Sequence, residues 1–162
     1  MALVPSRKSL QHLRCSVANT AELIGDRWTV LILRDAFMGV RRFDDFQKDL
    51  GIARNVLTER LTMLVDNDIL FTQQYEDRPP RFEYRLTPKG KDLFDVIVAM
   101  WRWGDTWNPP AEDDLRTLLH QDCGSYTHGV VRCEHCNGDL DHRNTRLTPL
   151  LDVVAERRSV SA

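Results

Sequence analysis

The stretch that decides the fold is residues 41–87, RRFDDFQKDLGIARNVLTERLTMLVDNDILFTQQYEDRPPRFEYRLT. Its first half contains two short helical patterns, and its second half contains two strand-like runs on either side of a charged tip with two prolines. Phe43, Phe46 and Leu50 give the first helix an apolar side, and Gly51 follows as a C-cap in the left-handed region. The stretch therefore predicts a helix, a turn, a second helix and a β-ribbon, in that order.

The second helix is expected over residues 53–66, with one apolar and one polar face. Leu57, Leu61 and Leu64 share one side and are predicted to be core. The opposite side carries residues of the kinds that pair with base edges or contact thymine methyl groups, namely Arg54 on the flank and Asn55, Thr58, Glu59 and Thr62. Such a helix fits DNA recognition or an ordinary amphipathic surface helix, and the short Gly51-Ile52 connection favours recognition.

The ribbon is expected to have strands at 69–75 and 81–86, joined by a turn at 76–80 where proline fixes the backbone. The return strand alternates polar and apolar residues with period 2. Its inward-facing residues are predicted to be Phe82, Tyr84 and Leu86. A helix-turn-helix followed by such a ribbon is the layout of a winged helix, which places its second helix in the DNA major groove.

Four arginines surround this unit at positions suited to the DNA backbone. They precede the first helix or bracket the tip of the ribbon: Arg41, Arg42, Arg78 and Arg81. Phosphate contacts of this kind position a protein without specifying sequence. The alternative for the two at the tip is that they are mobile surface side chains.

The flanking segments predict supporting helices. Residues 18–24 suggest a short helix, and Asp26 is a plausible N-cap for a second helix from Arg27, in which Trp28 is expected in the core. Thr87 as N-cap and Pro88 at the first helical position start another helix. Its apolar stripe, for which we favour dimerisation, comprises Leu93, Phe94, Ile97, Met100, Trp101 and Trp107.

These patterns divide the chain into four parts and give an α+β fold, a winged helix-turn-helix domain with a small C-terminal β-rich appendage. We expect a flexible arm at 1–14, the DNA-binding and dimerisation domain at 15–108, the appendage at 111–147 and a C-terminal tail at 148–162. The boundary follows from Asn108-Pro109-Pro110, which should end the preceding helix.

The appendage contains four candidate metal ligands in two pairs: His120 and Cys123, then Cys133 and Cys136. Two residues separate the members of each pair, and nine separate the pairs, which is close to the spacing of a zinc ribbon. Four protein ligands would make a structural site, with one zinc ion per chain. Free thiols are an alternative, and so is a disulfide, although cytosolic disulfides are rare.

Composition and net charge constrain the function less than the motifs do. The chain has 162 residues and a net charge of −2, and residues 41–92 carry ten basic and ten acidic side chains. No run of about 18 apolar residues and no secretory signal is present, so we expect a cytoplasmic protein without a membrane partner. The phosphate-loop, HExxH and GxSxG motifs are missing, which argues against an enzyme.

Three ordered motifs carry a family resemblance. They are CSVANTAELIGDRWTVLILRDAFMGVRRFDDFQKDLGIARNVLTERLTMLVDNDIL, then YEDRPPRFEYRLTPKGKDL, and finally WRWGDTW. From about Cys15 to Trp107 the chain resembles the HxlR family of bacterial winged-helix transcriptional regulators, which are MarR-like. The resemblance implies a homodimer on a pseudo-palindromic DNA operator, with Asn55, Thr58 and their neighbours facing DNA and the tip arginines at the wing.

The resemblance also bears on Cys15, since many members carry a cysteine just before the first helix. In some of them it senses oxidants or electrophiles, so an oxidant or small-molecule effector is conceivable. A thiol responds only if it is accessible and its pKa is lowered, and a small packed cysteine is the alternative. Two other functions stay open at this point: a protein-interaction winged helix without DNA binding, and a thiol-based redox protein.

Overall fold

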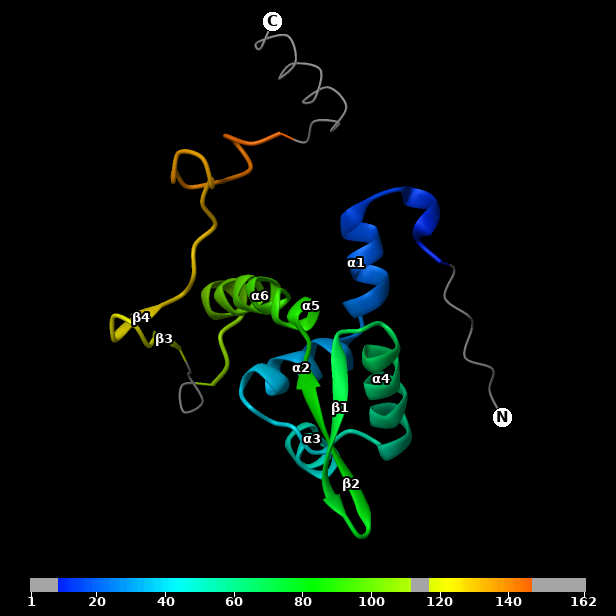
Figure 1. The fold of residues 1–162 in the computed structure, drawn as a ribbon. Coiled ribbons are helices and arrows are strands. Elements are labelled where there is room, and N and C mark those ends of the chain that lie inside the picture. The colour runs from blue at the N-terminus through cyan, green and yellow to red at the C-terminus, as the bar shows by residue number, and fades with distance from the viewer. Residues whose placement is uncertain (1–8, 112–116, 147–162) are drawn as a thin grey trace, which may run out of the picture. The chain divides into compact units, whose positions relative to one another are not determined.

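The computed structural model describes residues 9–111 and 117–146. The chain divides into two compact units, Met1–Asn108 and Pro109–Ala162, and the division lies at the Asn108-Pro109-Pro110 segment. The elements of the first unit are the 3-10 helix η1 (Gln11–Leu13), α1 (Ser16–Ile24), α2 (Arg27–Phe37), α3 (Phe43–Leu50), α4 (Arg54–Asp66), β1 (Leu70–Asp77), β2 (Pro80–Leu86), α5 (Pro88–Lys91) and α6 (Phe94–Trp107) (Figure 1). The predicted α+β winged helix is confirmed.

Local capping explains where these helices begin and end. Asp26 Oδ1 accepts hydrogen bonds from the backbone N–H groups of Trp28 (3.0 Å) and Thr29 (3.4 Å) at the start of α2. Gly51 ends α3 with φ of 60°, a left-handed conformation that favours glycine. Thr87 Oγ1 accepts from the backbone N–H of Gly90 at 3.0 Å and so caps α5. All three caps were predicted.

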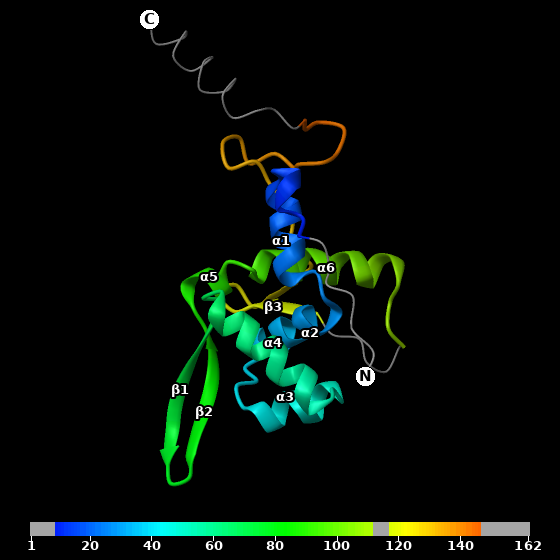
Figure 2. The ribbon, with the colours of Figure 1, turned by 90° about the vertical axis from the view of Figure 1, so that its right-hand side faces the viewer.

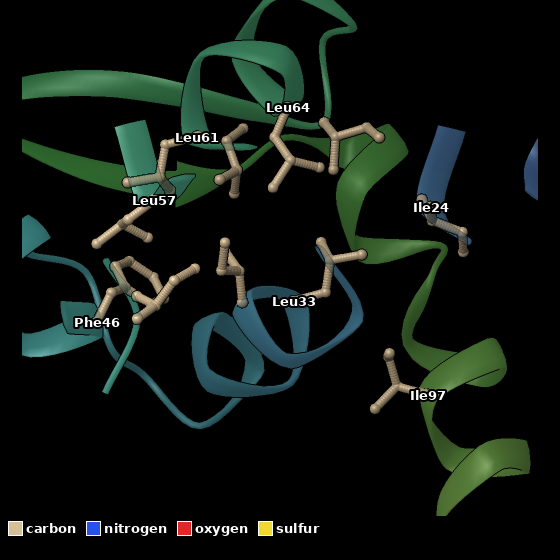
Figure 3. Close-up of a cluster of buried hydrophobic side chains, with 11 residues drawn as sticks. Ile24, Leu33, Phe46, Leu57, Leu61, Leu64 and Ile97 are labelled. Atoms are coloured by element: carbon tan, nitrogen blue, oxygen red, sulfur yellow. The ribbon is translucent and has the colours of Figure 1, made fainter. Parts of the chain in front are cut away.

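One hydrophobic core joins α2, α3 and α4. Leu57, Leu61 and Leu64 of α4 are fully buried and point toward Leu33 of α2 and Phe46 of α3 (Figure 3). Burying such side chains stabilises the fold by about 1.5–3 kcal/mol each. Trp28 is half-buried and packs against the edge of this core rather than inside it. The leucine stripe thus fixes which face of α4 turns outward.

The wing is the antiparallel β1–β2 hairpin, whose tip extends past the helices (Figures 1 and 2). Its pairing runs from Leu70–Leu86 to Asp77–Pro80, so the turn is shorter than predicted. The prediction that Phe82 faces inward is wrong, because Phe82 is 47% exposed. The other two residues predicted to face inward, Tyr84 and Leu86, are half-buried against the core.

The residues of the apolar stripe predicted after Thr87 are partly buried in the core and partly exposed. The chain leaves the helix at Asp92-Leu93, so α5 and α6 are separate. On α6, Ile97 is buried in the core, whereas Met100, Trp103 and Trp107 are 50%, 62% and 73% exposed.

Among the helices of the described residues, none is long and apolar enough to cross a membrane.

The remaining predicted segments are described in part. Within the arm at 1–14, residues 1–8 lie outside the described residues, while the Ser9 hydroxyl and the Leu10 N–H both donate to Glu22 of α1, at 3.3 and 3.2 Å. The second unit contains the short antiparallel hairpin of β3 (Leu118–His120) and β4 (Ser125–Thr127). The predicted tail at 148–162 lies outside the described residues.

Candidate nucleic-acid interface

The exposed face of α4 presents all four polar residues predicted to face DNA. Asn55, Thr58, Glu59 and Thr62 are exposed on the side opposite the buried leucines. Glu59 forms an ion pair with Arg60 at 3.1 Å, and the Thr58 hydroxyl donates to the Arg54 carbonyl at 2.9 Å. The side chains of Asn55 and Thr62 have no hydrogen bond or ion pair with any described residue, so both are available to a ligand.

Arg54 connects the start of α4 to the start of α3. Its guanidinium lies over the Phe43 ring, 4.7 Å from the centroid, and its Nη1 is 3.8 Å from Asp44 Oδ1. A cation above an aromatic face gains about 0.5–1 kcal/mol at an exposed site. The side chain is therefore held at the edge of the recognition face while its donors remain exposed.

Arg42 makes the corresponding connection between α3 and the wing. Its guanidinium lies 4.6 Å from the centroid of the Tyr75 ring on β1, and its Nε is 3.7 Å from Glu83 on β2. The backbone supports this arrangement, since Tyr84 N–H donates to the Arg41 carbonyl at 2.7 Å and Arg42 forms an isolated bridge with Glu83. The segment before α3 is thereby attached to the base of the wing.

The tip of the wing carries the other two predicted arginines. Arg81 Nε is 3.3 Å from Glu76 Oε2, and a hydrogen bond to Tyr75, followed by the charge of Glu76, raises the pKa of Arg81 above its ordinary value. Arg78 is exposed in the turn and has no ion pair with the described residues. Both side chains can therefore reach a phosphate.

Tyr75 is a residue that the sequence did not single out for this surface. Its ring lies under the Arg42 guanidinium, and its hydroxyl contributes to the raised pKa of Arg81. Nothing in a strand-like run marks one aromatic residue for this role, because the two arginines come from other parts of the sequence. Tyr75 therefore lies between an arginine from the segment before α3 and an arginine from the second strand of the wing.

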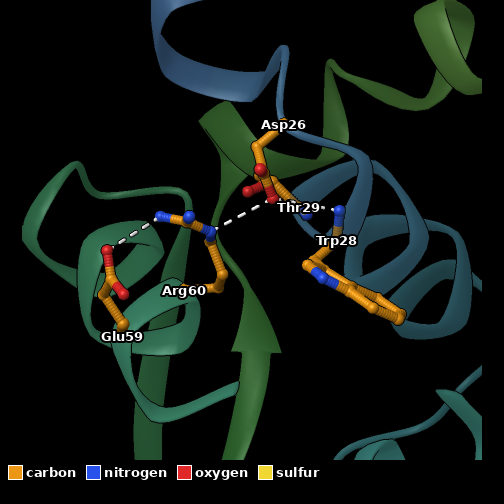
Figure 4. A network of polar contacts seen from close by, with 5 residues as sticks. All are labelled: Asp26, Trp28, Thr29, Glu59 and Arg60. Carbon is orange, nitrogen blue, oxygen red and sulfur yellow. Dashed lines mark hydrogen bonds and ion pairs between the residues drawn. The ribbon is translucent and has the colours of Figure 1, made fainter. Parts of the chain in front are cut away.

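Arg60 is the second residue that the sequence missed. Its Nε donates to Asp26 Oδ1 at 3.1 Å, and the same carboxylate oxygen caps α2 (Figure 4). The side chains of Arg60 and Asp26 are only 25% and 21% exposed. This contact fixes α4 against the start of α2, and the Arg60–Glu59 ion pair extends it to the recognition face.

The cysteines lie in two different settings. Cys15 is exposed at the N-cap of α1, where its side chain makes no capping hydrogen bond. In the second unit, hydrogen bonds from Ser125 lower the pKa of Cys123 below its ordinary value. The backbone N–H of Cys136, followed by that of His135, lowers the pKa of Cys133.

The four predicted metal ligands occur as two separate pairs. His120 Nδ1 is 3.2 Å from Cys123 Sγ, and Cys133 and Cys136 lie on a turn closed by the hydrogen bond from Asn137 N–H to the Cys133 carbonyl at 2.8 Å. No group of three or more His, Cys, Asp or Glu side chains lies close enough to hold a metal ion in the described parts of the chain. The zinc site therefore stays a prediction.

Known proteins share this architecture. Residues 23–112 match the HxlR-like helix-turn-helix family. An uncharacterized HTH-type transcriptional regulator of Mycobacterium tuberculosis is 43% identical over 134 residues, which cover 83% of this chain and 85% of that protein. A crystal structure of a candidate transcription factor superposes with a TM-score of 0.77 at 36% identity and covers 87% of this chain and 99% of that one.

A third comparison concerns a protein described as a redox regulator. The reduced form of HypR superposes with a TM-score of 0.54 at 29% identity, over 57% of this chain and 92% of that one. Together with the outward face of α4 and the wing, these likenesses define a winged helix-turn-helix transcriptional regulator, a class whose partner is DNA. The chain belongs to the HxlR-like helix-turn-helix family.

Proposed function

We propose that the protein is a homodimer that binds a pseudo-palindromic operator, with α4 of each protomer in the major groove and the tip of the β1–β2 hairpin on the flanking backbone. The observation that carries this proposal is the state of the α4 face. Asn55 and Thr62 are exposed with unengaged side chains, opposite a fully buried leucine stripe. These two side chains have no partner in the free protein and leave that part of the face open to a ligand.

Each side chain on this face has a specific role in the proposal. Asn55 pairs with the N6 and N7 groups of adenine, and Arg54 pairs with guanine. The hydroxyl of Thr58 already donates to the Arg54 carbonyl, so its methyl group is what remains for a thymine methyl contact. Glu59 can accept a hydrogen bond from cytosine N4.

The arginines at the edge of the surface contact phosphates, and in the free protein most of them face carboxylates. Arg54 pairs with Asp44, Arg42 with Glu83 and Arg81 with Glu76, at 3.8, 3.7 and 3.3 Å. Exposed ion pairs are worth about 0–1 kcal/mol, so a phosphate can replace the carboxylate at small cost. Arg41 and Arg78 complete the set of phosphate-contacting residues.

The exposed apolar side of α6 supports the dimer. Met100, Trp103 and Trp107 share one side of this helix and are exposed, and large exposed apolar patches mark interaction surfaces. Pairing two protomers would cover them and place the two α4 helices on half-sites about one helical turn of DNA apart.

Binding-site selection from random duplex DNA tests this proposal. We expect an enriched palindrome with half-sites about 10 base pairs apart, and affinity that falls steeply with salt, at about 0.9 logarithmic units per phosphate contact. The alternative is a winged helix that docks other proteins. It predicts no enriched sequence even at low salt, and that result would overturn the proposal.

A second candidate function is supported by Cys15 and by the likeness to HypR. The Cys15 thiol is exposed at the start of α1, where an oxidant or electrophile could reach it and change the N-terminal helix by forming an adduct or disulfide. We expect peroxide or a quinone to change the operator affinity of the wild-type protein but not that of Cys15→Ser. Equal responses of the two proteins would exclude sensing by Cys15.

A further inference from the structure

Two turns of the C-terminal unit have the same local geometry. In the first, Gly124 has φ of 68° and its N–H donates to the His120 carbonyl at 2.8 Å. In the second, Asn137 has φ of 57° and its N–H donates to the Cys133 carbonyl at 2.8 Å. Each turn therefore starts at one candidate ligand and ends just after the other. The residue with left-handed backbone directly follows the second ligand, Cys123 in the first turn and Cys136 in the second.

Antiparallel backbone pairing holds each turn in place. The first turn joins β3 to β4, whose last pair is His120–Ser125. The second is flanked by the Arg132–Asp139 bridge, and Cys133 N–H donates to the Gly138 carbonyl at 2.8 Å. The geometry is not a property of sequence spacing alone, because both turns are fixed by hydrogen bonds on either side.

The chemistry of the four side chains suits a metal. Three of them are cysteines, which bind a metal as thiolates, and the fourth is a histidine.

The imidazole of His120 lies between a cysteine sulfur and a carboxylate. Its Nδ1 faces Cys123 Sγ at 3.2 Å, and its Nε2 lies 3.7 Å from Asp122 Oδ2. A histidine that binds a metal through one nitrogen usually donates its other N–H to a carboxylate or carbonyl. Asp122 lies on the side of that second nitrogen, at ion-pair distance.

We propose that the two turns close on one Zn²⁺ ion, bound tetrahedrally by His120, Cys123, Cys133 and Cys136. Three sulfur ligands and one imidazole are a set that zinc prefers, and four protein ligands leave no position for a reacting water. The site is therefore structural. It goes beyond DNA binding and lies entirely within the second unit.

Closure requires the two pairs to approach one another, because no three candidate ligands lie together among the described residues. Nine residues, 124–132, connect the pairs, and a segment of that length spans up to about 30 Å when extended, so the chain permits the approach. Each cysteine that binds zinc gives up its thiol proton, so about three protons are released per ion.

Metal content of the full-length protein tests the proposal directly. We expect about one zinc per chain after purification without added metal. Replacement by Co²⁺ should give the thiolate charge-transfer and d–d absorption of a tetrahedral site. Less than about 0.2 zinc per chain would overturn the proposal. So would a purified Cys15→Ser protein whose three remaining cysteines react as free thiols or form a disulfide.

Matched variants separate ligands from bystanders. Cys123→Ser and Cys136→Ser should each lose most of the bound zinc, whereas Cys15→Ser and His142→Gln should keep it. His120→Cys should keep the bound zinc because it supplies a fourth ligand, and His120→Gln should lose most of it. Full zinc occupancy in both Cys123→Ser and Cys136→Ser would contradict the assignment.

The readout is independent of operator binding. Circular dichroism and DNA affinity report on the first unit, so a variant that loses zinc but retains both has lost the site without losing the winged helix. If the protein carries zinc but selects no DNA sequence, the proposed function fails while this proposal stands.

Discussion

At the scale of single residues, Arg60 shows how the recognition helix is held. It occupies the flank of α4 between the buried leucines and the exposed polar face, and it reaches a carboxylate 34 positions earlier in the chain. That carboxylate, on Asp26, also caps α2. One oxygen thus joins the start of one helix to the middle of another.

Replacing Arg60 should therefore destabilise the first unit. Arg60→Met keeps the apolar stem and removes the charge, and we expect a loss of about 1–2 kcal/mol in the free energy of unfolding, because a half-buried hydrogen bond between charged groups is removed. Urea denaturation measures it. Glu59→Gln, at the exposed end of the same network, is the control and should cost less than about 0.5 kcal/mol. Equal costs would show that the Asp26 contact contributes nothing.

Tyr84 gives a prediction about pH. Burial raises the pKa of its phenol above the ordinary value of 10.0. The contribution of Tyr84 to the free energy of unfolding is therefore fully present below pH 10. It is lost as pH rises above 10, because the phenol ionises first in the unfolded chain. Between pH 9 and 11, unfolding free energy should fall more steeply for wild type than for Tyr84→Phe. Identical slopes would contradict this explanation.

At the scale of elements, the wing combines arginines with carboxylates that restrain them. Arg81 is paired with Glu76 in the free protein, and in the proposed complex DNA would displace that carboxylate. The acidic residues near the tip should therefore reduce non-specific affinity, which is useful to a protein that must find one site among many.

Glu76→Gln should consequently strengthen binding to random-sequence duplex by about two- to fivefold at low salt, because one repulsive charge and one competing ion pair are removed. Fluorescence anisotropy measures the affinity. Asp66→Asn removes the same charge from the last residue of α4 and serves as the control, with a smaller expected effect. Unchanged or weaker binding by Glu76→Gln would show that Arg81 is not a phosphate contact.

The apolar side of α6 yields a prediction about assembly. Trp103 is 62% exposed, so Trp103→Glu should leave the fold intact while placing a charge in the proposed dimer interface. Light scattering coupled to size exclusion should then report a monomer instead of a dimer. Tyr126→Glu introduces the same charge at an exposed aromatic residue of the second unit and should not change the mass. A dimeric Trp103→Glu protein would place the interface elsewhere.

Elements set by local rules were predictable from sequence, and those set by distant contacts were not. The cap at Asp26, the left-handed Gly51 and the leucine stripe of α4 each depend on a few neighbouring residues. Phe82 was misplaced because its exposure depends on how far the hairpin extends past the helices. Tyr75 was missed because its partners, Arg42 and Arg81, approach it only in the folded protein.

At the scale of the whole molecule, the winged helix and the candidate metal ligands lie in different units. The first unit contains the winged helix and its exposed α6 face, and the second contains the paired turns with the candidate ligands. Net charge hides this division, since residues 41–92 are balanced at ten basic and ten acidic side chains while residues 105–162 carry six and ten. Composition alone therefore does not locate the candidate interface.

The central claim is that the outward face of α4 reads base sequence, and Asn55 tests it most directly. Once binding-site selection has given an operator, affinities of wild type and Asn55→Ala should be compared across all single-base variants of one half-site. We predict that Asn55→Ala loses about 1–3 kcal/mol at one base position and discrimination only there, whereas Arg78→Ala weakens every sequence alike. An Asn55→Ala protein with the wild-type pattern of preferences at every position would contradict the claim.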